Sequence, residues 1–299
     1  MKHNEKKQHL SFHRQKSQAL LVLLGPSLAG VAVFYLLPFL EVLRRSFTDA
    51  MGKRFVGLQN YKIVWQNRAF HLAAANTARF LAFCIPALLL FSLVLALLVR
   101  AAGRQGRPFQ SIFLLPLAVP VASIVLLWKV LFADAGLLNS LLIWLGAQPM
   151  DFMGTNAAFW VLIVTYLWKN SGYDLLLWIA GLDRIPLVQY EAAAVDGANS
   201  WQMFRCITLP GLAPTLGLTA LLSLVNSFKV FREAYLVAGQ YPHESMYLLQ
   251  HLFNNWFLNL ELGRITAAAV LVVGAMLLCA GAFFAINAHR KRRKPSCNG

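Results

Sequence analysis

The segment between residues 183 and 210 combines carboxylates with small side chains. In chain order, its distinctive residues are Glu191, Ala192, Ala193, Asp196, Gly197, Ile207, Leu209 and Pro210. A carboxylate can pair with a basic group on another chain, and alanine side chains let a second backbone approach closely. The pattern therefore predicts docking of a partner protein. A hairpin lying on lipid, anchored by Trp201 and Phe204, is the alternative, but it does not explain the small residues beside Glu191.

Two short helices are expected to carry this segment. Pro is favoured in the first turn of a helix and Gly just past its end, so Pro186 and Gly197 indicate a helix over residues 187–195. Asn199 or Ser200 then offers a cap for a second short helix. The segment returns to an apolar part of the chain immediately afterwards.

The composition is that of a membrane protein, because 58% of the 299 residues are hydrophobic and only 13% are charged. A helix needs roughly 20 apolar residues to cross a bilayer. Six spans are predicted, over residues 17–40, 80–99, 108–132, 156–182, 207–228 and 265–289. They give an all-α, polytopic membrane domain over residues 17–289, with a loop at 183–210 and basic tails at 1–16 and 290–299.

The fourth predicted span carries Lys169 and Asp174 in its middle. Ionisable groups at membrane depth usually face a bundle interior or a wet cavity, so this span is expected to be the least exposed to lipid. The alternatives are that Lys169 snorkels to the interface or that the helix is broken there.

The net charge of +15 is distributed around the spans and so indicates a bilayer, with no nucleic-acid partner. Basic residues precede the first span, lie between the second and third, and follow the last. By the positive-inside rule, both termini are expected in the cytoplasm of a bacterial cell. Residues 133–155, predicted to be external, contain no Lys or Arg. The first external loop, residues 41–79, is an exception, because it is basic.

Neither a metal site nor a catalytic constellation is predicted. The four cysteines, Cys84, Cys206, Cys279 and Cys297, form no CxxC pair, and the seven histidines include no HExxH motif. The chain also lacks a phosphate-binding loop of the form GxxxxGK[ST]. No cofactor is therefore expected on this chain.

The spacing of Glu191-Ala192-Ala193, three residues, Gly197, nine residues, and Ile207-x-Leu209-Pro210 resembles a known signature loop. It is similar to the loop of the membrane-spanning permeases of binding-protein-dependent ABC importers, in particular carbohydrate permeases of the maltose and glycerol-phosphate type. The stretches around Gly57 and Gly136 are similar to that family as well.

The resemblance implies a type I importer permease fold, in which this loop is a coupling helix that docks on an ATP-hydrolysing subunit. It implies that Glu191 pairs with a basic group there, that Gly197 allows the turn, and that the alanines fill the cleft. The implied partners are ATPase subunits that use ATP and magnesium, a second permease, and an external sugar-binding protein.

The resemblance also implies a substrate site on the fourth and fifth spans. Its positions correspond to Asn170, Tyr173, Ser223, Asn226 and Ser227. Sugars require hydrogen-bonding groups and a stacking aromatic ring, which these residues supply. Ser and Asn also join membrane helices without touching any ligand, and that alternative stays open.

The expected function is import of a sugar, oligosaccharide or polyol by a subunit that is not itself an enzyme. A permease for another solute is the nearest alternative. An ion-coupled secondary transporter is less favoured, because no inverted internal repeat is found in the sequence. An integral-membrane enzyme would need a metal or nucleophile constellation, which the sequence lacks.

Overall fold

The computed structural model describes residues 24–292, and the predicted tail 1–16 lies outside them. All regular elements of the described part are helices, with one isolated bridge between Thr48 and Phe55. The all-α prediction is therefore confirmed. The chain forms two compact units: one comprises the residues up to Gln66 with Trp256–Cys279, and the other Asn67–Asn255 with the residues from Ala280 onward.

Five helices in the described part of the chain are long and apolar enough to cross a membrane. They are Leu24–Ser46, Arg68–Ala101, Val121–Trp144, Ala213–Ala238 and Leu262–Gly281. The remaining predicted span, 156–182, is the helix α8 (Ala157–Asp183), whose middle carries Lys169 and Asp174.

The first unit contains the π-helical stretch η1 (Ala32–Leu36), α2 (Leu37–Ser46) and α3 (Gln59–Gln66). Asn60 fixes the loop before α3, because its Nδ2 donates to the carbonyl oxygens of Ser46 and Thr48 at 3.0 and 2.7 Å. Residues 17–23 of the first predicted span lie outside the described residues, and the helix continues past position 40 to Ser46.

The second unit holds most of the helices. They are α4 (Arg68–Ala101), η2 (Gly103–Gln105), α5 (Gly106–Ala118), α6 (Val121–Phe132), α7 (Leu137–Trp144), α8, α9 (Leu187–Val195), α10 (Ser200–Met203), η3 (Phe204–Thr208), α11 (Leu209–Gly211), α12 (Ala213–Ser227), η4 (Phe228–Val230), α13 (Phe231–Ala238) and η5 (Glu244–Met246). Helices α14 (Leu249–Leu258) and α15 (Leu262–Arg292) each contribute to both units.

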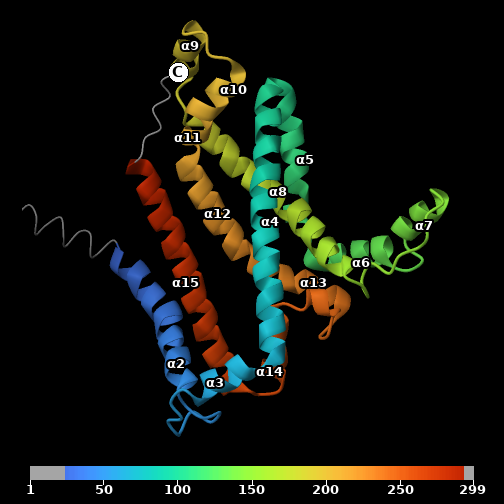
Figure 1. Cartoon of the computed structure of the whole chain (residues 1–299), viewed down its shortest axis with the longest axis vertical. Coiled ribbons are helices and arrows are strands. Elements are labelled where there is room, and N and C mark those ends of the chain that lie inside the picture. The colour runs from blue at the N-terminus through green and yellow to red at the C-terminus, as the bar shows by residue number, and fades with distance from the viewer. Residues whose placement is uncertain (1–23, 293–299) are drawn as a thin grey trace, which may run out of the picture. The chain divides into compact units, whose positions relative to one another are not determined.

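Helix α8 is central to the second unit, where it packs against α4, α5 and α12 (Figure 1). Of its 27 residues, 14 are buried, among them Leu162, Tyr166 and Trp178. The expected low lipid exposure of this segment follows from that burial. Gly172 lets α5 approach α8, because a Cβ atom at this position would overlap the backbone carbonyl of Phe113.

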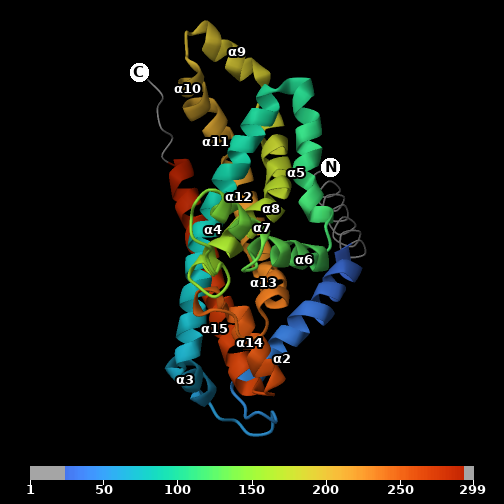
Figure 2. The same cartoon turned by 90° about the vertical axis from the view of Figure 1, so that its right-hand side faces the viewer.

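The predicted span 108–132 is not one helix. The chain breaks between α5 and α6, where Val119 has an extended backbone and Pro120 begins the next helix. A residue before Pro is disfavoured in the α region, which explains the break. Helix α6 consequently runs across the direction of α5 in both views (Figures 1 and 2).

Three other predicted spans differ in their ends. Helix α4 begins at Arg68 instead of position 80, since Asn67 caps it by accepting from the backbone NH of Phe70. The fifth span starts within η3 and continues beyond 228 through α13. The last helix ends at Arg292, so the predicted tail 290–299 starts inside it, and its residues 293–299 lie outside the described residues.

Both π-helical stretches lie just before a proline. Stretch η1 ends two residues before Pro38, and η3 ends two residues before Pro210. Proline cannot donate a backbone hydrogen bond, and its ring crowds the carbonyl four residues earlier. The wider π turn accommodates this local mismatch while the helix continues.

Candidate functional site

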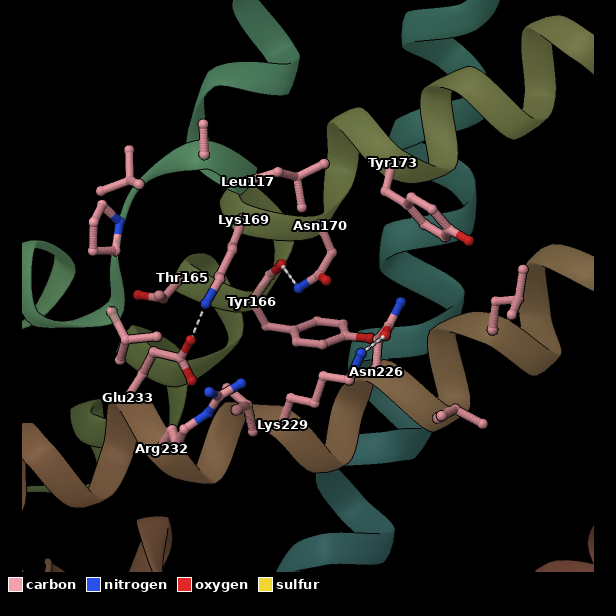
Figure 3. A pocket seen from close by; sticks show the side chains of 17 residues that line it. Leu117, Thr165, Tyr166, Lys169, Asn170, Tyr173, Asn226, Lys229, Arg232 and Glu233 are labelled. Carbon is pink, nitrogen blue, oxygen red and sulfur yellow. Dashed lines mark hydrogen bonds and ion pairs between the residues drawn. The ribbon is translucent and has the colours of Figure 1, made fainter. Parts of the chain in front are cut away.

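A cavity of about 660 Å³ lies in the second unit, beside the break between α5 and α6 (Figure 3). Helix α8 supplies one wall, and α12, η4 and α13 supply another. Because the chain turns at Val119 and Pro120, α6 does not continue along α8 and the space beside α8 stays open. The polar side chains in its lining are Thr165, Tyr166, Lys169, Asn170, Tyr173, Asn226, Lys229, Arg232 and Glu233.

An ion pair connects two walls of the cavity. The Nζ atom of Lys169 on α8 donates to Oε1 of Glu233 on α13, and Figure 3 shows the two side chains pointing toward each other. The side chain of Lys169 is 20% exposed, whereas that of Glu233 is 1% exposed. The second oxygen of Glu233 is buried and has no partner in the described structure. Lys169 therefore faces a cavity, one of the two environments predicted for it.

Three of the five predicted substrate residues line this cavity: Asn170, Tyr173 and Asn226. The Nδ2 atom of Asn170 donates to the carbonyl oxygen of Tyr166 on its own helix at 2.9 Å. The Oδ1 atom of Asn226 accepts from Lys229 at 2.8 Å. Together they give the cavity an aromatic ring and amide groups that can both donate and accept hydrogen bonds.

The other two predicted residues are buried and do not line the cavity. Ser223 donates to Oδ2 of Asp174 at 2.8 Å, and this bond joins α12 to α8. Tyr166 also donates to the carbonyl oxygen of Ser223, at 2.7 Å. Ser227 donates to the carbonyl oxygen of Leu224 on its own helix, at 2.6 Å. In this structure, Ser223 therefore joins two helices without lining the cavity, which is the alternative role given above for Ser and Asn.

The prediction omitted the cavity's charged residues from its substrate set. Lys229, Arg232 and Glu233 lie within the candidate span Ala213–Ala238, and they line the cavity with Lys169. The available signal was the presence of ionisable side chains inside an apolar segment, which indicates a polar environment at membrane depth.

The second candidate site is the loop 183–210, which follows α8. Helix α9 spans Leu187–Val195, as predicted, and Pro186 lies at its N-cap, one residue before the first turn. Gly197 has φ of +78°, a left-handed conformation, and a Cβ there would meet no neighbour within 4 Å. Asn199 caps α10 and forms a reciprocal capping box with Gln202. Local sequence signals therefore predicted the conformation of the loop correctly.

Most of the predicted docking residues of this loop are exposed. Glu191, Ala192, Asp196, Gly197, Leu209 and Pro210 are exposed, Ala193 is half-buried, and Ile207 packs against the core cluster that contains Leu212. Tyr190 was not predicted as a structural contact, yet its hydroxyl lies 2.9 Å from the Thr208 hydroxyl and joins the two sides of the loop. The loop is thereby held as a unit.

The loop lies at the same end of the second unit as the basic turn between α4 and α5 (Figures 1 and 2). The helix ends that lead into these two segments are in direct contact, because Nη1 of Arg100 in α4 donates to the carbonyl oxygen of Leu182 in α8 at 3.0 Å. Among residues 24–292, no group of three or more His, Cys, Asp or Glu side chains could hold a metal ion.

Helices long enough to cross a membrane, a polar cavity and a projecting helical loop are features of membrane transport subunits. Residues 89–293 match the family described as the inner membrane component of binding-protein-dependent transport systems. The chain belongs to this family. Its permeases work with ATP-hydrolysing subunits, a second permease and a binding protein. The chain is therefore a multi-pass membrane protein and not an enzyme in its own right.

Curated relatives cover most of the chain. The trehalose/maltose transport system permease protein MalF of Thermococcus litoralis is 32% identical over 78% of this chain and 80% of its own length. The probable starch degradation products transport system permease protein AmyD of Thermoanaerobacterium thermosulfurigenes is 29% identical over 83% and 87%, respectively.

A solved bacterial ABC transporter involved in the import of the acidic polysaccharide alginate is also similar. The superposition has a TM-score of 0.78, with 22% sequence identity, and covers 96% of this chain and all of that one. At this level of identity, the likeness shows the fold alone, and the fold is that of an ABC importer permease.

Proposed function

We propose that this permease imports a carbohydrate, which passes through the cavity beside α8. The observation that carries the proposal is the cavity's lining, because Tyr173, Asn170 and Asn226 lie around one space. A saccharide presents hydroxyl groups to amides and a ring face to an aromatic side chain. The names of the two relatives given above, which refer to trehalose, maltose and starch products, support the same class of substrate.

We further propose that the loop 183–210 couples this chain to the ATPase, which binds ATP and magnesium. Glu191 is exposed on α9 and is available to a basic group of that partner. The contact between Tyr190 and Thr208 joins the two sides of the loop, which favours movement of the loop as one body. Closure of the ATPase can then shift α8 and α12, the helices on either side of the cavity.

The orientation proposed for the chain puts this loop and both termini in the cytoplasm of a bacterial cell. The end of α4, the turn after it and the start of α5 carry Arg100, Arg104 and Arg107. The bond from Arg100 to Leu182 joins this region to the end of α8, where the loop 183–210 begins. Lys and Arg in short loops favour the cytoplasmic side.

The test of the substrate site compares Asn226→Ala with Ser227→Ala in the assembled importer. Asn226 lines the cavity, whereas the neighbouring Ser227 is buried outside the lining, so the pair separates substrate contact from helix packing. Losing one hydrogen bond to a sugar costs on the order of 1 kcal/mol, or several-fold in KM. We expect that rise for Asn226→Ala only. Equal kinetics in both variants and the wild type, across all transported sugars, would remove Asn226 from the proposed site.

The test of coupling compares Glu191→Ala with Asp134→Ala, which removes an exposed carboxylate from the loop after α6. We expect Glu191→Ala to abolish ATP-driven uptake and to weaken recovery of the ATPase, while Asp134→Ala leaves both unchanged. A buried ion pair that loses one partner typically costs about 2–5 kcal/mol. Gly197→Val adds a strain of roughly 1–3 kcal/mol to the turn and is also expected to lower uptake. Unimpaired uptake and ATPase recovery in Glu191→Ala and Gly197→Val would contradict the coupling role.

A further inference from the structure

The cavity carries an excess of positive charge. Lys169 is paired with Glu233, so these two charges compensate each other. Lys229 and Arg232 line the same cavity, and no acidic side chain among residues 24–292 pairs with either of them. Lys229 donates only to the neutral amide of Asn226, at 2.8 Å. Two cationic charges are thus left without an anionic partner.

This excess lies where the membrane makes it costly. Both Lys229 and Arg232 belong to the candidate span Ala213–Ala238, and both are exposed in the chain as it stands. Cations at membrane depth are rare unless they face a wet pathway or meet an opposite charge. Figure 3 shows the two side chains on the same wall, near Asn226, so an anion in the cavity would lie within their common field.

The geometry points to an acidic saccharide as the cargo, bound through its carboxylate by Lys229 and Arg232. This inference rests on the proposed function and narrows its substrate class. The planar guanidinium of Arg232 suits bidentate contact with a carboxylate, and Lys229 adds a second positive charge. Asn170 and Tyr173 line the same cavity and can hydrogen-bond to hydroxyl groups, so the cavity suits both the acidic and the neutral groups of such a sugar.

The experiment uses two disaccharides that differ only at the carboxylate positions: digalacturonate and the neutral disaccharide in which each carboxylate is reduced to a hydroxymethyl group. Binding of each is measured by calorimetry to the importer complex in nanodiscs, without the binding protein, so that the permease alone discriminates. We expect the wild type to bind digalacturonate roughly tenfold more tightly, the scale of one charge-assisted hydrogen bond. The preference should weaken as salt concentration rises.

The variant Lys229→Gln/Arg232→Gln should lose the preference, because its affinity for digalacturonate falls to the level of its affinity for the neutral disaccharide. The control is Lys129→Gln, which removes a cation from α6 outside the cavity lining and should keep the preference. Equal binding of the two sugars by the wild type, or a preference that survives in the double variant, would overturn the acidic-cargo inference. It would leave carbohydrate import intact. Failure of the wild type to bind either disaccharide would also overturn the inference, whereas the carbohydrate assignment is decided by the Asn226 test across all transported sugars.

Purification supplies a second decisive readout, because an acidic residue of the second permease would be the other means of compensating these cations. We expect the double variant to recover that subunit in normal yield. If the second permease is lost from Lys229→Gln/Arg232→Gln, the cations serve subunit pairing, and the inference falls.

Discussion

Replacing Lys169 by Met tests whether its ion pair with Glu233 holds α8 and α13 together. The carboxylate of Glu233 is 1% exposed, and its Oε2 already lacks a partner, so removal of Lys169 leaves a buried charge without any hydrogen bond. Breaking a buried pair in this way costs about 3–5 kcal/mol. The reverse change, Glu233→Gln, leaves a lysine that is 20% exposed and can reach water in the cavity, so it should cost only about 1–2 kcal/mol.

The assay is thermal unfolding of the purified importer in detergent, with the two single variants and the double variant Lys169→Met/Glu233→Gln. We expect Lys169→Met to lower the melting temperature by several degrees and Glu233→Gln to lower it less. The double variant should recover much of the loss, because it no longer contains a buried charge; a coupling of about 2 kcal/mol lies within the range for residues in contact. The reasoning would be refuted if Lys169→Met melted at the same temperature as the wild type. It would also be refuted if the loss in the double variant equalled the sum of the two single losses.

Three further changes test packing and protonation in the second unit by the same unfolding assay. Gly172→Ala places a methyl group against the backbone of Phe113 and should cost about 1–3 kcal/mol by moving α5 from α8; an unchanged melting temperature would contradict this close packing. Ser92→Ala leaves the buried Nε1 of Trp178, now 2.9 Å from the Ser92 hydroxyl, without an acceptor, for about 1–3 kcal/mol, whereas Ser92→Thr should retain the bond. Burial lowers the pKa of His251 from 6.5 to about 4, so stability should be complete above pH 6.5 and decline toward pH 4, by on the order of 3 kcal/mol. His251→Gln should flatten that decline, and an equally steep one in the variant would exclude His251 as its source.

The conformation of the loop 183–210 could be predicted from the sequence because it is decided locally. Pro186 fixes the start of α9, and Gly197 supplies the positive φ after it. Asn199 caps α10 because its side chain accepts a hydrogen bond from the backbone NH of Gln202, three residues away. Each of these signals acts over a few residues and needs no tertiary partner. The bond between Tyr190 and Thr208 could not be predicted in the same way, because it joins separate helices.

The cavity was harder to predict. The spacing of residues in the sequence shows which side chains share a face of a helix, but it does not show what that face contacts. Ser223, Asn226 and Ser227 follow one another at intervals of three and one residues, and 223 and 227 are one turn apart. Only Asn226 lines the cavity, since Ser223 is bound to Asp174 and Ser227 bonds back to its own helix. The rotation of α12 about its axis decides this, and it is set by packing against α8.

The position of the cavity follows from two departures from the pattern of a lipid-facing helix. The extended backbone at Val119 ends α5 early, so no continuous helix fills the space beside α8. Across that space, Glu233 lies in α13 near the end of a span, where only a counter-charge makes its burial tolerable. Lys169 supplies this charge from the opposite wall. Because a lipid-facing surface would penalise the chain break and both ionisable groups, their meeting at one place is better explained by a solvated pathway than by helix packing alone.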